Sequence, residues 1–193
     1  MIGKAVSCLL MVLLVMACTE QAEQEVANGQ QGMASFDRPA PVVTGTDQDG
    51  KTFSTTALNG SYWLASFMFT TCQTVCPALN SVQADLANAY ASKGLRFVSI
   101  STDPTNDTPE ALRAYAARYG ATPGRWWMLT MPIDTVMSVA TTGFAVMAPE
   151  TPDMHSTRFV LVDRNQRIRD YFDSADSSEV VRLKRTLDCL LNE

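Results

Sequence analysis

The most constraining feature of this sequence is an apolar segment that leads directly into two closely spaced cysteines. Residues 62–69 are almost continuously apolar and aromatic, which is typical of a strand buried on both faces of a sheet. Cys72 and Cys76 follow at once, and Pro77 comes next. Proline is favoured in the first turn of a helix, and residues 76–90 repeat apolar side chains at helical spacing. The sequence therefore predicts a buried strand, a short loop and a helix, with the cysteine pair at their junction.

The rest of the chain alternates predicted strands with predicted helices. The predicted elements are a hairpin over 42–54 around an Asp-Gly turn, a strand over 95–100, a helix over 107–119, a strand over 126–129, a helix over 132–141, a hairpin over 157–172 and a helix over 177–191. This order predicts an α/β domain with a central mixed sheet flanked by helices. With a cysteine pair between a buried strand and a helix, it indicates a thioredoxin-like fold with an N-terminal hairpin.

Composition limits the class of protein further. The chain has 193 residues and 46% of them are hydrophobic, which suits one domain with a substantial core. The formal net charge is −5, and no long run of lysine and arginine is present. Nucleic-acid binding needs a basic surface that neutralises phosphates, so we expect no nucleic-acid partner.

The first residues are typical of an export signal. Lys4 precedes an apolar run over 5–17, which is shorter than the roughly 20 residues that span a membrane and suits residues 1–17 as a secretory signal. The run ends at Cys18 in a pattern that resembles a bacterial lipobox, so we expect Cys18 to carry a lipid. A plain cleaved signal or a short anchor is the alternative.

The next residues predict a tether to the working domain. Residues 18–35 are rich in Gln, Glu, Ala and Gly and contain too little apolar surface to fold. We therefore expect a flexible tether over 18–35 and one folded domain over 36–193. On this interpretation the domain is lipid-anchored on the periplasmic side of a bacterial membrane.

The cysteine pair allows three kinds of chemistry. The positive end of a helix dipole favours thiolates, which makes Cys72 and Cys76 better nucleophiles and better metal ligands. Two converging thiolates form a soft site for Cu(I) that also accepts Cu(II) or zinc. They can equally form a redox-active disulfide, or a permanent one that links the loop to the helix.

His155 is the only histidine in the chain and directly precedes the strand predicted over 157–162. Considered by itself, it would be interpreted as a solvent-exposed side chain. Beside a dithiolate, an imidazole at the end of a neighbouring strand becomes a candidate third ligand for a metal ion. We therefore predict a site made of Cys72, Cys76 and His155.

Three segments in this order resemble the Sco/SenC family: residues 67–77 (FMFTTCQTVCP), residues 97–104 together with 107–110, and residues 155–163. The resemblance extends over about 36–191. It implies a thioredoxin-like fold that binds one copper ion through Cys72, Cys76 and His155. Asp103 and the 107–110 segment match positions that we interpret as turns and a helix cap.

The resemblance also implies a function. The family takes part in maturation of the binuclear copper centre of cytochrome c oxidase, as copper donor or as thiol reductant of the acceptor cysteines. We therefore expect a metallochaperone whose partner is the copper-centre subunit of the oxidase or another copper chaperone. The alternative is a thiol–disulfide oxidoreductase that uses Cys72 and Cys76 as its redox pair.

The chain departs from the family pattern between the two cysteines. Members usually have proline after the first cysteine and often an acid next, where this chain has Gln73 and Thr74. The lost carboxylate removes a charge close to the metal, which leaves the balance between Cu(I) and Cu(II) open. Cys189 is expected on the exposed side of the last helix, without a role.

Overall fold

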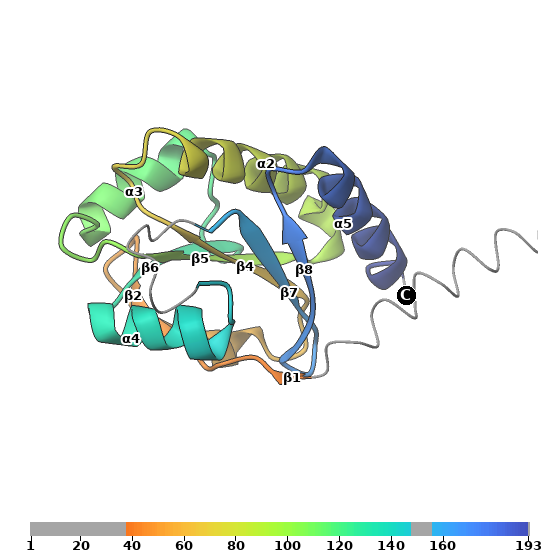
Figure 1. The fold of residues 1–193 in the computed structure, drawn as a ribbon, viewed down its shortest axis with the longest axis horizontal. Coiled ribbons are helices and arrows are strands. Elements are labelled where there is room, and N and C mark those ends of the chain that lie inside the picture. Colours follow the sequence, from red (N-terminus) through yellow and green to blue (C-terminus); the bar gives the residue numbers. More distant parts are fainter. Residues whose placement is uncertain (1–37, 148–155, 193) are drawn as a thin grey trace, which may run out of the picture. The chain divides into compact units, whose positions relative to one another are not determined.

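The computed structural model describes residues 38–147 and 156–192 (Figure 1). Its centre is an eight-stranded mixed sheet with the strand order β1-β8-β7-β4-β5-β6-β2-β3. Strands β4, β5 and β6 are parallel, and the other pairings are antiparallel. The α/β class and the mixed sheet predicted from the sequence are confirmed.

The described elements follow the predicted order closely. The strands are β1 (Arg38–Pro39), β2 (Thr44–Asp47), β3 (Thr52–Ser54), β4 (Trp63–Met68), β5 (Arg96–Ser101), β6 (Trp126–Thr130), β7 (Arg158–Val162) and β8 (Arg167–Asp173). The helices are α2 (Val75–Ala89), α3 (Pro109–Arg118), α4 (Ile133–Ser138) and α5 (Ser177–Leu190), with short 3₁₀ turns at Thr55–Leu58 and Ala91–Lys93.

Strand β4 is buried along its whole length, as its continuous apolar run predicts. It lies between β7 and β5 and pairs with β5 in parallel from Trp63 opposite Arg96 to Met68 opposite Ser101. Helix α2 returns the chain from the end of β4 to the start of β5. The carboxyl end of β4, where Cys72 follows, therefore lies at the same edge of the sheet as the loop between β5 and α3.

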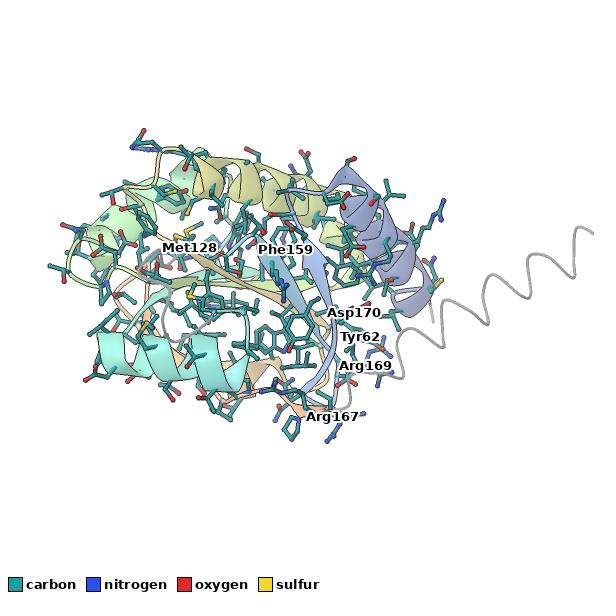
Figure 2. All side chains as sticks on the ribbon, in the orientation of Figure 1. Tyr62, Met128, Phe159, Arg167, Arg169 and Asp170 are labelled. Carbon is teal, nitrogen blue, oxygen red and sulfur yellow. The ribbon has the colours of Figure 1, made fainter. Side chains whose placement is uncertain are left out.

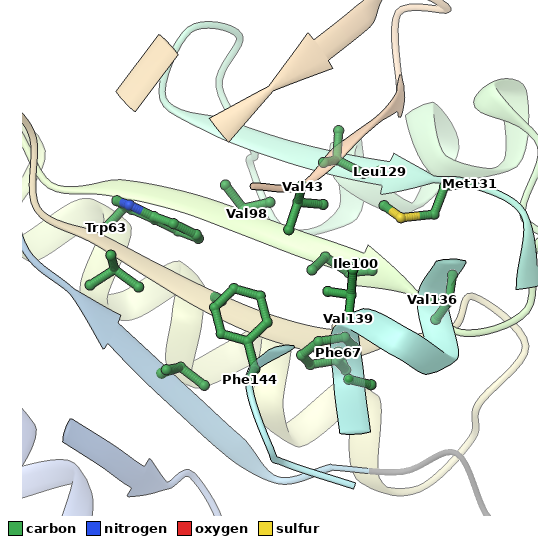
Figure 3. Close-up of a cluster of buried hydrophobic side chains, with 14 of the residues drawn as sticks. Val43, Trp63, Phe67, Val98, Ile100, Leu129, Met131, Val136, Val139 and Phe144 are labelled. Carbon is green, nitrogen blue, oxygen red and sulfur yellow. The ribbon is translucent and has the colours of Figure 1, made fainter. Parts of the chain in front are cut away.

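Helices α2, α3 and α5 cover one face of the sheet, and α4 lies on the other (Figure 1). Met128 and Phe159 are fully buried between the sheet and the three helices (Figure 2). On the α4 side, Phe67 and Trp63 pack edge-on against Phe144, with ring centroids 5.9 and 6.1 Å away (Figure 3). These two layers hold β4 rigidly, and with it the start of the cysteine loop.

Two local features differ from the sequence prediction. The helix predicted over 132–141 is α4 followed by a π-helical turn, Val139–Gly143. The sequence does not predict strand β1, because two residues that include a proline are too few to show an alternation of apolar and polar side chains. This strand pairs with β8 through Arg38 opposite Ile168. Within 38–147 and 156–192, no helix has the length and apolarity that crossing a membrane requires.

Candidate functional site

The two cysteines lie where the sequence predicts them. Cys72 is in the loop after β4, and Cys76 is in the first turn of α2. Both side chains are buried, with 6% and 2% of their surface exposed, and neither is in a disulfide. The Cys72 amide donates to the carbonyl oxygen of Phe69 at 3.3 Å, which turns the loop back toward the helix.

The Cys72 sulfur lies at the amino end of α2, where backbone N–H groups lack partners within the helix. The Cys76 amide donates to the Cys72 Sγ at 3.3 Å. Burial raises the pKa of the Cys72 thiol, but hydrogen bonds from the amides of Cys76, Thr74 and Val75 outweigh it and hold the pKa below its ordinary value. Cys72 is therefore the member of the pair that is more readily a thiolate.

Cys76 has the opposite electrostatic environment. The pKa of its thiol is raised to about 12, mainly by burial and in part by the Cys72 sulfur and the Asp107 carboxylate, while the backbone of Phe69 lowers it. A thiol beside a thiolate at hydrogen-bond distance shares its proton with it, which favours one negative charge on the pair. The pair is one nucleophilic sulfur supported by a protonated neighbour.

A buried carboxylate connects the cysteine loop to the next strand. Asp107 is fully buried and accepts from the Thr70 amide at 3.1 Å, from the Thr70 hydroxyl at 2.5 Å and from the Ser101 hydroxyl at 2.5 Å. Thr70 is two residues before Cys72. Within the 107–110 segment, which resembles a turn and a helix cap, the cap is Thr108, which accepts from the Ala111 amide. Asp107 instead accepts hydrogen bonds from the cysteine loop and from β5.

Asn80 and Tyr115 together fix the first turn of α2, and the sequence did not predict either of them. Asn80 is fully buried and its amide nitrogen donates to the Cys76 carbonyl oxygen at 2.9 Å and to the Tyr115 hydroxyl at 3.3 Å. Burial and the neighbouring Tyr119 hydroxyl raise the pKa of Tyr115. The one signal in the sequence is weak: Asn80 is a polar residue at an inward-facing position of α2, where a buried polar group needs hydrogen-bond partners.

Several predicted residues fall elsewhere. His155 and Cys18 lie outside the described residues. Among the residues that are described, no group of three or more His, Cys, Asp or Glu side chains forms a metal-binding cluster. Cys189 is exposed, as predicted from its helix face.

The described geometry defines a thiol protein with a thioredoxin-like α/β fold and a dithiol at a strand–helix junction. The model of the SCO1/SenC family matches residues 41–187. The chain belongs to the SCO1/SenC family, as the sequence resemblance predicted.

Curated relatives agree with this assignment. The chain is 33% identical over 151 residues to the SCO1 protein homolog of Bacillus subtilis, which covers 74% of this chain and 78% of that protein. It is 30% identical over 119 residues to a protein of Stutzerimonas stutzeri that is provisionally named copper-binding, with 58% of each chain covered.

Solved structures share the fold. A SCO1/SenC family lipoprotein from Bacillus anthracis superimposes with a TM-score of 0.72 at 29% identity, covering 82% of this chain and 96% of that one. BsSco, described as having a disulfide switch and as a member of the Sco family of cytochrome c oxidase assembly proteins, gives 0.66 at 27% identity, covering 78% and 94%.

Proposed function

We propose that this protein is an extracytoplasmic metallochaperone that carries one copper ion for assembly of the copper centre of cytochrome c oxidase. Copper is its cargo, and its partners are the copper-centre subunit of the oxidase or another copper chaperone. Family membership supports this proposal, together with the copper-binding name of one relative and the assembly role stated for another.

The observation that carries the proposal is the buried dithiol at the amino end of α2. Thiolate sulfurs are the ligands that Cu(I) prefers in proteins. The three amide hydrogen bonds to Cys72 stabilise a thiolate before any metal arrives, and burial of both sulfurs keeps water from the site. These donors fit a soft monovalent ion better than a hard one that requires oxygen ligands.

His155 completes the proposed ligand set as the third donor. Residues 73 and 74, between the cysteines, provide no negative charge: the Gln73 side chain is exposed and donates to the Thr71 carbonyl oxygen at 3.2 Å. Two thiolates and a neutral imidazole leave one net negative charge on the site when it holds Cu(I), and no carboxylate between the cysteines adds the further negative charge that would stabilise Cu(II). We infer that it favours Cu(I) over Cu(II).

We also propose that Cys18 carries a lipid that holds the domain at the periplasmic side of a bacterial membrane. The lipobox-like run before Cys18 and the lipoprotein description of the Bacillus anthracis relative support this. Mass spectrometry of the protein from its membrane fraction tests it. An unmodified Cys18, or a chain that retains residues 1–17, would contradict it.

Anaerobic titration of the reduced protein with Cu(I), in competition with a chromophoric chelator, tests the copper proposal. We expect one tightly bound ion in the parent, with affinity lost in Cys72→Ser and Cys76→Ser and lowered in His155→Ala. Cys189→Ser is the matched control, because this cysteine is exposed on α5. Cysteine variants that bind as tightly as the parent would refute the proposal.

A thiol–disulfide oxidoreductase is the second candidate function. The unequal environments of the two thiols favour it, because one nucleophilic thiolate beside a protonated thiol suits attack on a disulfide. In that exchange the Cys72 thiolate attacks a disulfide of the acceptor. Cys76 then resolves the mixed disulfide, so the acceptor is reduced and this protein is oxidised.

Exchange with an oxidised acceptor peptide separates the two functions. If reduction of the acceptor proceeds without copper and needs both cysteines but not His155, the oxidoreductase is supported. If His155→Ala abolishes copper binding and leaves exchange unchanged, the dithiol performs both reactions and the histidine serves copper alone.

A further inference from the structure

Five arginines gather at the end of the sheet opposite the cysteines. They are Arg38 in β1, Arg96 at the start of β5, Arg164 in the turn after β7, and Arg167 and Arg169 in β8; we call them the arginine rim. Parallel strands β4 and β5 begin at this end and reach the cysteine loop at the other. Figure 2 labels Tyr62, Arg167 and Arg169 on the same side of the domain.

The rim is held on rigid backbone around Tyr62. The Arg96 amide donates to the Tyr62 carbonyl oxygen at 3.1 Å, and the Arg164 carbonyl oxygen accepts from the Gly60 amide at 2.9 Å. The Arg164 guanidinium lies over the Tyr62 ring, 4.9 Å from its centroid. These contacts bring two arginines that are far apart in the sequence next to Tyr62, Arg164 through its side chain and Arg96 through its backbone.

Two arginines of the rim have no ion-pair partner among the described residues. Asp163, in the turn after β7, is 7% exposed and its Oδ2 pairs with Arg169 at 3.4 Å. The other Asp163 oxygen accepts from the Asn165 and Arg167 amides. Arg96 and Arg164 make no ion pair with any residue in 38–147 or 156–192.

The opposite end of the sheet carries acids. Asp103 and Glu110 lie at the end of β5 and the start of α3, and Asp134 is in the first turn of α4; all three are exposed or half-buried. A molecule with a basic end and an acidic end turns in the field of a charged surface. Near an anionic membrane its rim would face the surface and its cysteines would face away.

We propose that the arginine rim docks on the anionic phospholipid headgroups of the membrane to which the chain is tethered. Guanidinium groups bind phosphate through two parallel hydrogen bonds, and a tyrosine ring among them suits the headgroup layer. The proposed tether ends at residue 35, and Arg38 of the rim follows three residues later in the chain, so the tether would join the domain next to the docking face. The inference rests on the proposed membrane location and not on copper binding.

Dicarbonyl footprinting of the full chain in vesicles tests this docking. Phenylglyoxal modifies accessible arginines, and mass spectrometry reads each one separately. We compare vesicles of phosphatidylcholine alone with vesicles that contain one third phosphatidylglycerol. Modification of Arg96 and Arg164 should slow several-fold in the anionic vesicles and recover in high salt. Arg158, exposed at the other end of β7, is the internal control and should not change.

A single variant tests whether the rim itself drives the docking. Each arginine near an anionic surface contributes about fivefold to the ratio of docked to free domain. Arg96→Gln should therefore lower that ratio about fivefold and make Arg164, which is exposed in the free domain, more reactive toward the reagent. Arg158→Gln should leave the protection of Arg164 intact. Equal protection of Arg164 in both variants would overturn the proposal.

The remaining outcomes distinguish membrane docking from lipid anchoring alone and from binding of an acidic protein. A chain that floats with both kinds of vesicle but protects its rim in neither refutes docking and leaves anchoring intact. A chain that floats only with anionic vesicles supports the rim and contradicts the lipid anchor. Inorganic phosphate at the same concentration should give no protection. Protection by soluble polyglutamate equal to that by vesicles would assign the rim to an acidic protein and overturn the membrane proposal.

Discussion

Replacement of Asp107 by alanine is expected to destabilise the fold and loosen the cysteine loop together. The carboxylate is fully buried and accepts hydrogen bonds from the amide and hydroxyl of Thr70 and from the hydroxyl of Ser101. A hydrogen bond to a charged group contributes about 1.5–3 kcal/mol. Losing three of them, with partial replacement by water, should lower the free energy of unfolding by about 4 kcal/mol.

The substitution should also change the thiols. The negative charge of Asp107 is one of the causes that raise the pKa of Cys76, so its removal should lower that pKa. Asp107→Asn keeps the shape and one acceptor, and we expect about half the loss of stability. The pH dependence of thiol alkylation, followed at each cysteine by mass spectrometry, measures the change.

Urea unfolding at constant m-value is the assay for stability. Asp103→Ala is the matched control, because the Asp103 carboxylate on the same loop accepts from the Asn106 amide and side chain at exposed sites and should cost less than about 1 kcal/mol. If Asp107→Ala costs no more than this control and leaves Cys76 alkylation unchanged, the carboxylate does not hold the loop.

Three further predictions follow from the site and the sheet. At neutral pH iodoacetamide should modify Cys72 well before Cys76, because the pKa of Cys72 is lowered by amide hydrogen bonds and that of Cys76 is raised by burial to about 12; equal rates would contradict this assignment. Above the pKa of Cys72, copper binding still has to displace the proton of Cys76, so copper affinity should rise by up to about tenfold per pH unit. Chelator competition at several pH values measures this, and an affinity that does not change with pH would count against Cys76 as a ligand. Gly45→Ala should lower the free energy of unfolding by about 1–3 kcal/mol, because the added Cβ would lie 2.8 Å from the Thr130 carbonyl oxygen, whereas Thr44→Ala at an exposed position should have little effect in the same urea assay.

Local patterns predicted the elements that form the site. The continuous apolar run of β4 and the helical spacing after Cys76 located the junction, since both follow from which faces must be buried. The Thr108–Pro109 start of α3 is a cap that short-range hydrogen bonding determines, and it is observed. These features depend on neighbours in the sequence, which is why the sequence alone reveals them.

The missed features depend on distant neighbours. Asp107 meets Thr70 across 37 positions, and Asn80 meets Tyr115 across 35. Neither pairing has a period or a turn signature, because only the packing of β4, β5, α2 and α3 brings the partners together. The arginine rim is a similar case: its members come from four separate segments, and the chain as a whole has a net charge of −5.

X-ray absorption at the copper edge of the Cu(I)-loaded protein tests the central claim most directly. The account predicts one copper ion with two sulfur neighbours and one imidazole nitrogen. Cys72→Ser and Cys76→Ser should each remove one sulfur, and His155→Ala should remove the nitrogen and keep both sulfurs. A copper environment without sulfur, or one that neither cysteine substitution changes, would contradict the proposed copper site.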